Sequence, residues 1–262
     1  MLPSYCIWGG ILIQGLLFKA TIAVISFCLM SSCVYIINDI RDCENDKKHQ
    51  KKCLRPIPHG DISVSNALIV GSVCFLVSIL VSILFVNYIC TVLLLIYILV
   101  NIVYSFWGKN IPVIDLGLLT ACFVIRVVYG GCATNIKVSG WLYLVVLSGS
   151  LFMALGKRRN EFVKGCDTRT VLRSYNESFL NNNMYVSLCL CEVFYSLWAI
   201  ENTNKLIKYT IPMFMFVLML YSLDVENDID GDPIEIILGS RKLFIGSCIY
   251  GVTIFLFLYL LP

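Results

Sequence analysis

Long, predominantly apolar stretches make up most of the chain, and polar residues gather in the segments between them. A transmembrane α-helix needs about 20 such residues to cross the hydrocarbon core of a bilayer. Nine stretches of 16 to 24 residues have this character: Leu2–Leu17, Ala20–Ile37, Ser63–Val86, Ile89–Trp107, Val113–Ala133, Trp141–Gly156, Met184–Ile200, Ile207–Leu223 and Leu243–Leu261. Strand-length alternation does not compete with them. The pattern predicts an all-α integral membrane protein, a bundle of about nine helices.

The composition supports the same class. Apolar residues make up 58% of the 262 residues and charged residues 14%, whereas a soluble domain carries about 25% charged residues. We predict a single transmembrane catalytic domain over 1–262, with polar loops at 38–62, 107–112, 157–183 and 224–242. The first stretch has no charged leader and no small-residue cleavage site, so we expect it to be part of a spanning helix.

The basic residues are distributed unequally between the two predicted sides of the membrane. Fifteen of the 20 Lys and Arg residues lie in the four polar loops, and four lie on the opposite side. Cytoplasmic loops carry the excess of Lys and Arg, so these loops and the N-terminus are predicted to be cytoplasmic, in the cell (plasma or inner) membrane. Nearly all the Asp and Glu residues gather on the same side, where topology does not require them. Their density there indicates chemistry.

The strongest candidate site follows the second apolar stretch. Asn38 is followed by Asp39, Asp42 and Asp46, and spacings of three and four place the carboxylates on one face of a continuing helix. Like charges at this spacing repel each other unless a cation lies between them. Mg²⁺ prefers oxygen ligands and is commonly shared between carboxylates and substrate phosphates. The alternative is a solvated helix end that the next lysines neutralise.

A basic cluster comes directly after the carboxylates. Its members are Lys47, Lys48, His49, Lys51, Lys52 and Arg55. Pro56, Pro58 and Gly60 then prevent the helix from continuing. Cations beside a metal site suit a polyanionic ligand, and Arg is well shaped for bidentate phosphate contact. Charge that only orients the protein or binds lipid headgroups is an equally good interpretation of the cluster.

The order and spacing of these motifs resemble the UbiA superfamily of intramembrane prenyltransferases, in its decaprenyl-phosphate phosphoribosyltransferase branch. The resemblance covers about residues 30 to 243. It rests on Asn38-Asp39-x-x-Asp42-x-x-x-Asp46 with Lys52-x-x-Arg55-Pro56, on Tyr104-Ser105-x-x-x-Lys109-x-x-x-x-x-Asp115, on Phe123-Val124-Ile125-Arg126-x-x-x-Gly130, on Ala154-Leu155-Gly156-Lys157-Arg158-Arg159-Asn160-Glu161 and on Gly231-Asp232-Pro233-Ile234-Glu235 with Arg241. It implies a UbiA-type helical bundle. Relatives usually carry a further Arg-Pro-containing motif before Leu2, so we expect the first helix to be short or truncated.

The loop at 157–183 distinguishes between branches of this superfamily. Aromatic prenyltransferases usually carry a second Asp-rich motif there. This chain has Lys157, Arg158 and Arg159 with one nearby acid, Glu161. A cationic loop is a poor second metal site but a good cradle for another phosphate, such as the 5-phosphate of phosphoribosyl pyrophosphate. Charge that serves only membrane topology is the alternative.

The resemblance implies a Mg²⁺-dependent cell-envelope transferase. It would move a 5-phosphoribosyl group from phosphoribosyl pyrophosphate to a polyprenyl phosphate and release pyrophosphate. The implied metal and diphosphate ligands are Asn38, Asp39, Asp42 and Asp46, and the three aspartates are the implied catalytic residues. The implied phosphate contacts are Lys52, Arg55, Lys109, Lys157 and Arg158. The implied ribose contacts, or residues that orient those cations, are Asp115, Glu161 and Tyr175, with Tyr104 also in the substrate site. No nucleic-acid partner is expected.

Two other functions stay open at this stage. An aromatic polyprenyltransferase that uses a prenyl diphosphate would share the first Asp-rich motif but would need acids in place of Lys157, Arg158 and Arg159. A non-enzymatic membrane transporter would need charges distributed through the membrane or internal repeats. Arg126 and Glu192 are the two charges well inside apolar stretches, either as a structural pair or with Arg126 at a lipid phosphate.

Overall fold

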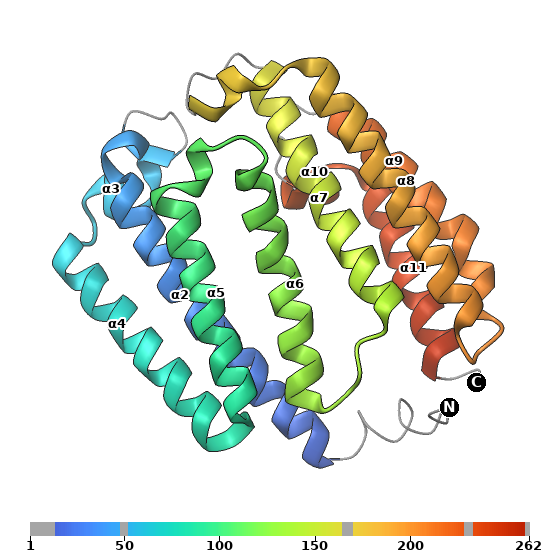
Figure 1. Cartoon of the computed structure of the whole chain (residues 1–262), viewed down its shortest axis with the longest axis horizontal. Coiled ribbons are helices and arrows are strands. Elements are labelled where there is room, and N and C mark those ends of the chain that lie inside the picture. The colour runs from blue at the N-terminus through green and yellow to red at the C-terminus, as the bar shows by residue number, and fades with distance from the viewer. Residues whose placement is uncertain (1–13, 48–51, 164–169, 228–232, 260–262) are drawn as a thin grey trace. The chain divides into compact units, whose positions relative to one another are not determined.

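The computed structural model describes residues 14–47, 52–163, 170–227 and 233–259, and the regular elements in these ranges are helical. The long helices are α2 (Gln14–Asp46), α4 (Val64–Val81), α5 (Tyr88–Phe106), α6 (Ile114–Thr134), α7 (Gly140–Val163), α8 (Glu177–Glu201), α9 (Ile211–Asn227) and α11 (Arg241–Tyr259) (Figure 1). The short helical segments are η1 (Lys52–Leu54), α3 (Pro56–His59), η2 (Ser82–Val86), η3 (Gly108–Asn110), η4 (Thr170–Ser174), η5 (Ile207–Thr210) and α10 (Pro233–Gly239). The all-α prediction is confirmed.

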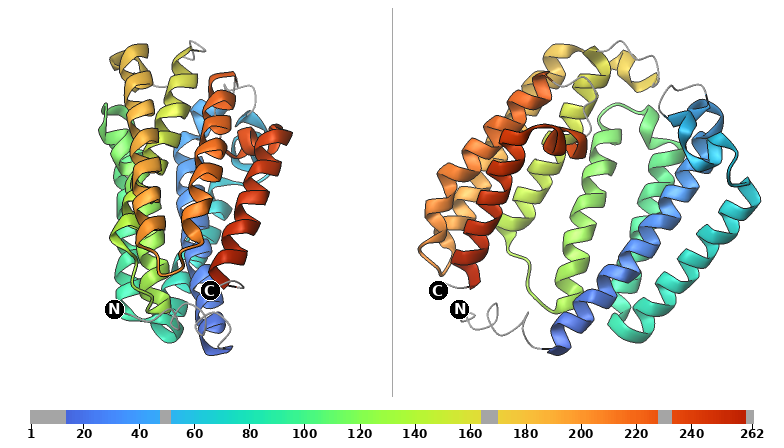
Figure 2. Two further views of the ribbon diagram at one scale, coloured as in Figure 1. Left: turned by 90° about the vertical axis from the view of Figure 1, so that its right-hand side faces the viewer. Right: turned by 180° about the vertical axis from the view of Figure 1, so that it is seen from behind.

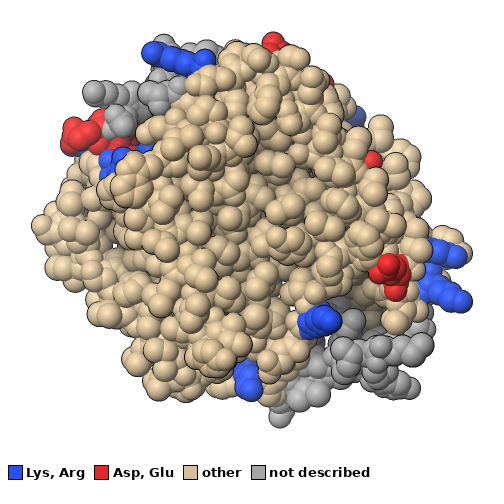
Figure 3. Space-filling view, in the orientation of Figure 1, with Lys and Arg blue, Asp and Glu red and all other residues tan. Residues whose placement is uncertain are grey.

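Eight helices in the described ranges are long and apolar enough to cross a membrane, at 18 to 30 residues each. Large apolar side chains remain exposed along them, including Leu76, Leu99 and Phe216. Figure 3 shows a face whose broad middle carries no Lys, Arg, Asp or Glu side chain. Hydrocarbon is a good solvent for such a surface, and helices satisfy their own backbone hydrogen bonds there. The chain is an integral membrane protein.

The boundary predicted between the first two apolar stretches is wrong. Helix α2 runs without interruption from Gln14 through Lys19 to Asp46. No proline or glycine follows Gly15 in this range, so nothing in the sequence stops the helix, and an exposed lysine near a helix end can extend its amine towards water. Most of the first predicted stretch, residues 2–13, lies outside the described residues.

The polar loop predicted at 157–183 is shorter than expected. Helix α7 continues through Lys157, Arg158 and Arg159 to Val163, and α8 already begins at Glu177. The segment after Gly156 contains good helix formers and no proline, so the helix extends beyond its apolar part. Asn176 starts α8, because its side chain accepts a hydrogen bond from the Phe179 amide at 2.7 Å.

The described residues form two compact units, and α6 contributes to both. The described part of the N-terminal unit comprises residues 14–47, 52–108 and 125–137. Its helices α2 and α4 lie side by side (Figure 1). Ser26 and Ser78 each donate a hydroxyl hydrogen bond to the other's carbonyl, at 2.9 and 2.7 Å. Such reciprocal bonds between small residues let two membrane helices approach closely.

The described part of the C-terminal unit comprises residues 109–124, 138–163, 170–227 and 233–259 and contains α7 to α11. Viewed from behind in Figure 2, the short α10 lies at the ends of α9 and α11. Phe152, Leu155, Leu180 and Met184 lie in its buried core. Gly156 allows α9 to come close to α7, since a Cβ atom there would lie 3.1 Å from Val225 Cγ1. This core surrounds one end of α7, where the candidate motif begins.

Candidate active site

Near the end of α2, two of the predicted carboxylates accept hydrogen bonds from the same arginine, Arg55. Arg55 Nη1 donates hydrogen bonds to Asp39 Oδ1 at 2.8 Å and to Asp46 Oδ2 at 3.0 Å. Residues seven apart lie on the same face of a helix, two turns along it. Asp42 lies between them in α2 and is half-buried. The helical face predicted from the spacing is therefore present in the N-terminal unit.

Local sequence brings Arg55 to this position. Arg55 precedes Pro56, which disfavours a helical conformation, and it is extended with φ −66° and ψ 146°. The next turn, α3, buries Ile57 in a small core with Cys43 of α2 and Ala67 of α4. Gly60, at φ +97°, ends α3 in a left-handed conformation that glycine adopts without steric cost. The anchored turn holds Arg55 against α2.

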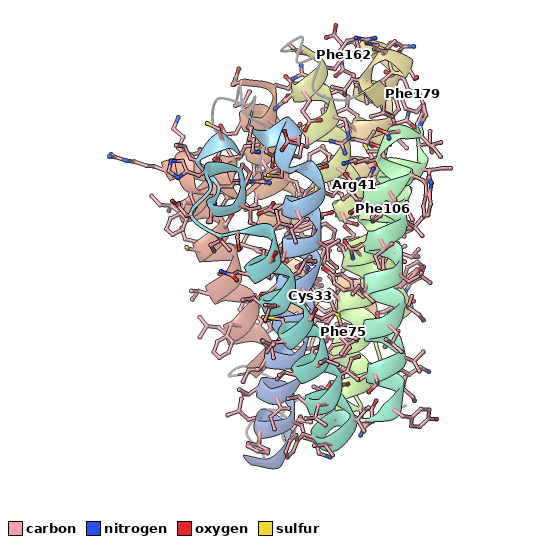
Figure 4. All side chains as sticks on the ribbon, turned by 90° about the vertical axis from the view of Figure 1, so that its left-hand side faces the viewer. Cys33, Arg41, Phe75, Phe106, Phe162 and Phe179 are labelled. Carbon is pink, nitrogen blue, oxygen red and sulfur yellow. The ribbon has the colours of Figure 1, made fainter. Side chains whose placement is uncertain are left out.

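The end of α5 supports the same part of α2. The Ser105 hydroxyl donates a hydrogen bond to the Asn38 side-chain carbonyl. Arg41 lies over the Phe106 ring, 4.2 Å from its centroid, and donates to the Phe106 carbonyl at 3.4 Å (Figure 4). Arg41 and Ser105 were not predicted as site residues, and no spacing rule links positions more than 60 residues apart. Tyr104, which was predicted, is half-buried in α5.

Lys47 does not neutralise this carboxylate face. Its amine donates to Glu44 at 2.7 Å on the exposed side of the helix end. That hydrogen bond, with the attraction of the Glu44 charge, raises the pKa of Lys47 above its usual range. Lys48 lies outside the described residues, and so does the side chain of Lys52. Among the described contacts, Arg55 supplies the positive charge shared by Asp39 and Asp46.

The oxygen-rich face of α2 carries the donor types that a divalent cation prefers. No group of three Asp, Glu, His or Cys side chains in the described ranges is gathered closely enough to hold a metal ion. Asp39 and Asp46 nevertheless converge on a single cationic nitrogen, and Asp46 is only 5% exposed. Two carboxylates aimed at one positive point, with Asp42 and Asn38 on the same helix, form a hard oxygen donor set of the kind that Mg²⁺ prefers. The donor types therefore suit Mg²⁺, although in the described structure the carboxylates are not gathered into a metal-ligand set.

A second arginine–carboxylate cluster lies in the C-terminal unit. Arg158 of α7 donates from Nε to Asp115 Oδ2 of α6 and from Nη1 to Glu161 Oε2, both at 2.8 Å. Tyr175 donates its hydroxyl proton to the other Asp115 oxygen at 2.6 Å. Arg158 is 1% exposed and Asp115 is fully buried. The structure thus brings together four of the predicted substrate-site residues.

The hydroxyl of Tyr175 also contacts the backbone before α6. It accepts a hydrogen bond from the Val113 amide at 2.7 Å. Val113 has φ +68°, and Asn135 is the other non-glycine residue in the described ranges with positive φ. Asparagine tolerates this conformation, whereas for a β-branched residue it is strained. Burial, with the hydrogen bond to Asp115, raises the pKa of Tyr175 far above its usual range, so the hydroxyl remains protonated.

The Lys157–Glu161 segment is not a uniform cationic loop. Arg159 donates to Asn181 of α8 at 3.0 Å, and the buried Asn160 donates to the Val225 carbonyl of α9 at 2.8 Å. Arg158 is committed to Asp115. Lys157 is half-buried in α7, and Lys109 is half-buried in η3. The sequence alone treats the three cations alike, and only the partners on other helices distinguish them.

Comparisons with known proteins identify the family. Residues 1–220 match the UbiA prenyltransferase family. The chain is 33% identical over 241 residues to a decaprenyl-phosphate phosphoribosyltransferase of Mycolicibacterium smegmatis, covering 86% of this chain and 76% of that protein. It is 30% identical over 260 residues to the corresponding protein of Corynebacterium glutamicum, covering 95% and 78%.

The fold also matches solved structures. A UbiA homolog from Archaeoglobus fulgidus, bound to GPP and Mg²⁺, has a TM-score of 0.72 at 17% identity, covering 92% of this chain and 87% of that one. The same homolog bound to DMAPP and Mg²⁺ has a TM-score of 0.71 at 16% identity, with the same coverage. The resemblance noted from the motifs is confirmed, and the chain belongs to the UbiA prenyltransferase family of membrane transferases.

Proposed function

We propose that the protein catalyses Mg²⁺-dependent transfer of a 5-phosphoribosyl group from phosphoribosyl pyrophosphate to a polyprenyl phosphate, with release of pyrophosphate. The observation that carries this proposal is the convergence of Asp39 and Asp46 on one cationic nitrogen. The choice of donor and acceptor is supported by 30–33% identity to proteins named decaprenyl-phosphate phosphoribosyltransferase over most of the chain.

The reaction is a single displacement at carbon. A phosphate oxygen of the polyprenyl phosphate forms a bond to C1 of the ribose as the bond from C1 to the pyrophosphate oxygen breaks, and that oxygen keeps the electron pair. The nucleophile is already an anion, so no general base is required. Asn38, Asp39, Asp42 and Asp46 would hold Mg²⁺, which supplies positive charge for the leaving pyrophosphate.

Arg55 has a specific place in this proposal. Its guanidinium is the positive charge shared by Asp39 and Asp46, and its side chain is 45% exposed. Arg55 and Asp39 are both partly exposed, and such an ion pair contributes only about 0–1 kcal/mol, whereas Asp46 is largely buried. A divalent cation would therefore compete with Arg55 for Asp39, and the guanidinium, a fork of N–H donors, would then suit a phosphate.

Other cations are assigned to phosphates on the same chemical grounds. Lys52 lies in η1 shortly before Arg55, and Lys109 and Lys157 lie at the predicted cytoplasmic ends of α5 and α7. We assign these three lysines to substrate phosphates and place the loops that carry them in the cytoplasm. Glu161 stays assigned to ribose hydroxyls or to orienting a cation, and Tyr104 to the substrate site.

The direct test uses purified protein in lipid nanodiscs with Mg²⁺, radiolabelled phosphoribosyl pyrophosphate and a polyprenyl phosphate. A labelled lipid product is expected, and a chelator should abolish it. Asp39→Ala and Asp42→Ala should each lower turnover at least about a hundredfold, because the charge on the leaving group is no longer balanced. Asp61→Ala is the matched control, since Asp61 is exposed and pairs with His59.

Two results would contradict the proposal. One is the absence of a labelled lipid from wild-type protein that does prenylate an aromatic acceptor with a prenyl diphosphate. The other is normal turnover in Asp39→Ala or Asp42→Ala, which would remove the metal assignment even if the substrates were correct.

A further inference from the structure

The buried cluster of Arg158, Asp115 and Tyr175 is not used by the proposed transfer. We propose that these are positioning residues, which hold Val113 in its left-handed conformation and thereby set the segment 109–113, with Lys109, for phosphate binding. Phosphate binding by Lys109 rests on the proposed function, whereas the stabilisation of the Val113 conformation by Tyr175 does not.

Burial argues against a direct phosphate contact by Arg158. Its side chain is 1% exposed, that of Asp115 is 0% exposed, and two of its nitrogens donate to carboxylates at 2.8 Å. A substrate phosphate would have to break these bonds and leave Asp115 buried without its partner. Removing one member of a buried ion pair is strongly destabilising. The Arg158–Asp115 pair therefore affects the substrate site indirectly, through Tyr175 and the Val113 backbone that Tyr175 contacts.

The hydrogen bonds in the cluster have a fixed direction. A carboxylate can only accept and a backbone N–H can only donate. Tyr175 must therefore donate to Asp115 and accept from Val113, as the distances of 2.6 and 2.7 Å indicate. Arg158 occupies the second Asp115 oxygen, so the first is directed at Tyr175. The chain of contacts runs from Arg158 through Asp115 and Tyr175 to the Val113 amide.

The backbone of Val113 needs the hydrogen bond to Tyr175, because its conformation is strained. At φ +68° the backbone of this branched residue is strained, and the residue is 58% exposed, so its own packing does little to keep it there. Strain of this kind persists when surrounding contacts impose it, and it often occurs at functional sites. The Tyr175 hydroxyl supplies such a contact, from a residue 62 positions away.

Val113 lies directly before α6, in the short segment that connects Lys109 to this helix. Pro112 fixes its own φ and favours an extended Ile111, so little backbone freedom remains between Lys109 and Val113. The Asp115 amide donates to the Ile111 carbonyl at 3.1 Å, and the Gly117 amide donates to the Val113 carbonyl at 2.9 Å. A change of φ at Val113 would therefore redirect the segment that carries Lys109.

A set of paired variants tests the inference. Tyr175→Phe removes the hydroxyl and is expected to lower kcat/KM for phosphoribosyl pyrophosphate about tenfold, a typical effect of losing a hydrogen bond to a charged group. In a Val113→Gly background the same change should cost less than about threefold, because glycine adopts positive φ without strain. Val113→Ala is the matched control: it keeps a Cβ atom, so the full tenfold loss should return.

A second measurement does not depend on activity. Hydrogen–deuterium exchange in a peptide covering residues 109–113 should become at least about tenfold faster in Tyr175→Phe, while peptides from α8 and α9 keep their wild-type rates. If no phosphoribosyl transfer is found in the wild type, the proposed function fails and this faster exchange still supports the positioning role. Equal losses in the wild-type, Val113→Gly and Val113→Ala backgrounds, or unchanged exchange, would overturn it.

Discussion

Two arginine–carboxylate clusters in this protein have the same chemistry but differ in the exposure of the arginine. Arg55 pairs with Asp39 and Asp46 at 2.8 and 3.0 Å and is 45% exposed. Arg158 pairs with Asp115 and Glu161, both at 2.8 Å, and is 1% exposed. The distances alone do not distinguish them. The exposure of the arginine side chain does distinguish them, because it decides whether another ion can replace the arginine beside the carboxylates.

The physical reason is the cost of removing charge from water. Near a surface, solvent screens an ion pair and can replace either partner, so the pair contributes about 0–1 kcal/mol. In a buried site an unpaired charge is unfavourable by several kcal/mol. Replacing one partner of a buried ion pair must first overcome this free energy. Arg55 is thus suited to give way to a metal ion, and Arg158 is suited to maintain a fixed geometry.

The largest expected effect contrasts the same substitution in the two clusters. Asp115→Ala leaves Arg158 buried without its main partner and should lower stability by about 3–5 kcal/mol, seen as a fall in thermal midpoint on the order of 10 °C. Asp39→Ala should change the midpoint by no more than a few degrees. Thermal unfolding of both variants in one detergent measures this, and similar midpoints would refute the contrast.

An intermediate effect concerns metal binding in the absence of substrate. Arg55→Ala removes the cation that competes for Asp39 and Asp46, so Mg²⁺ should bind more tightly, by up to about fivefold for 1 kcal/mol. The Mg²⁺ concentration that gives half of the maximal thermal stabilisation reports this. Arg173→Ala, an exposed arginine of the C-terminal unit, is the control and should leave that concentration unchanged. Weaker Mg²⁺ binding in Arg55→Ala would mean that Arg55 assists the metal.

The smallest effect is the response to salt. Screening shortens the Debye length from about 10 Å at 0.1 M to about 3 Å at 1 M ionic strength, and it acts mainly on exposed charges. A double-mutant cycle between Arg55 and Asp39 should give a coupling below about 1 kcal/mol that vanishes at 1 M salt. The cycle between Arg158 and Asp115 should keep most of its coupling. An equal loss of coupling free energy at 1 M salt in both cycles would contradict the difference in exposure between the two clusters.

The first cluster could be largely predicted from sequence because its geometry is local. Asp39, Asp42 and Asp46 follow helical spacing in an extension of an apolar helix, and Pro56 imposes the extended backbone of Arg55. That Arg55 donates to Asp39 and Asp46 was not predicted, since a cation nine and sixteen residues away could equally face solvent or lipid headgroups.

The second cluster could be predicted only as a set of residue types. Lys157, Arg158 and Arg159 are adjacent cations, and the sequence offers no reason to separate them. In the structure Arg158 lies against Asp115, 43 residues away, while Arg159 turns to Asn181 of α8. Successive helical residues point about 100° apart, so neighbours in sequence meet different helices.

The amino-acid sequence by itself determined the all-helical membrane class, the family and the carboxylate face on α2, because these depend on hydrophobic length, motif order and helical period. The tertiary structure decided which arginine is exposed, which is buried, and that Tyr175 holds a strained Val113. Burial and exchangeability arise from contacts between residues 9 to 62 positions apart, and such contacts exist only once the helices have packed.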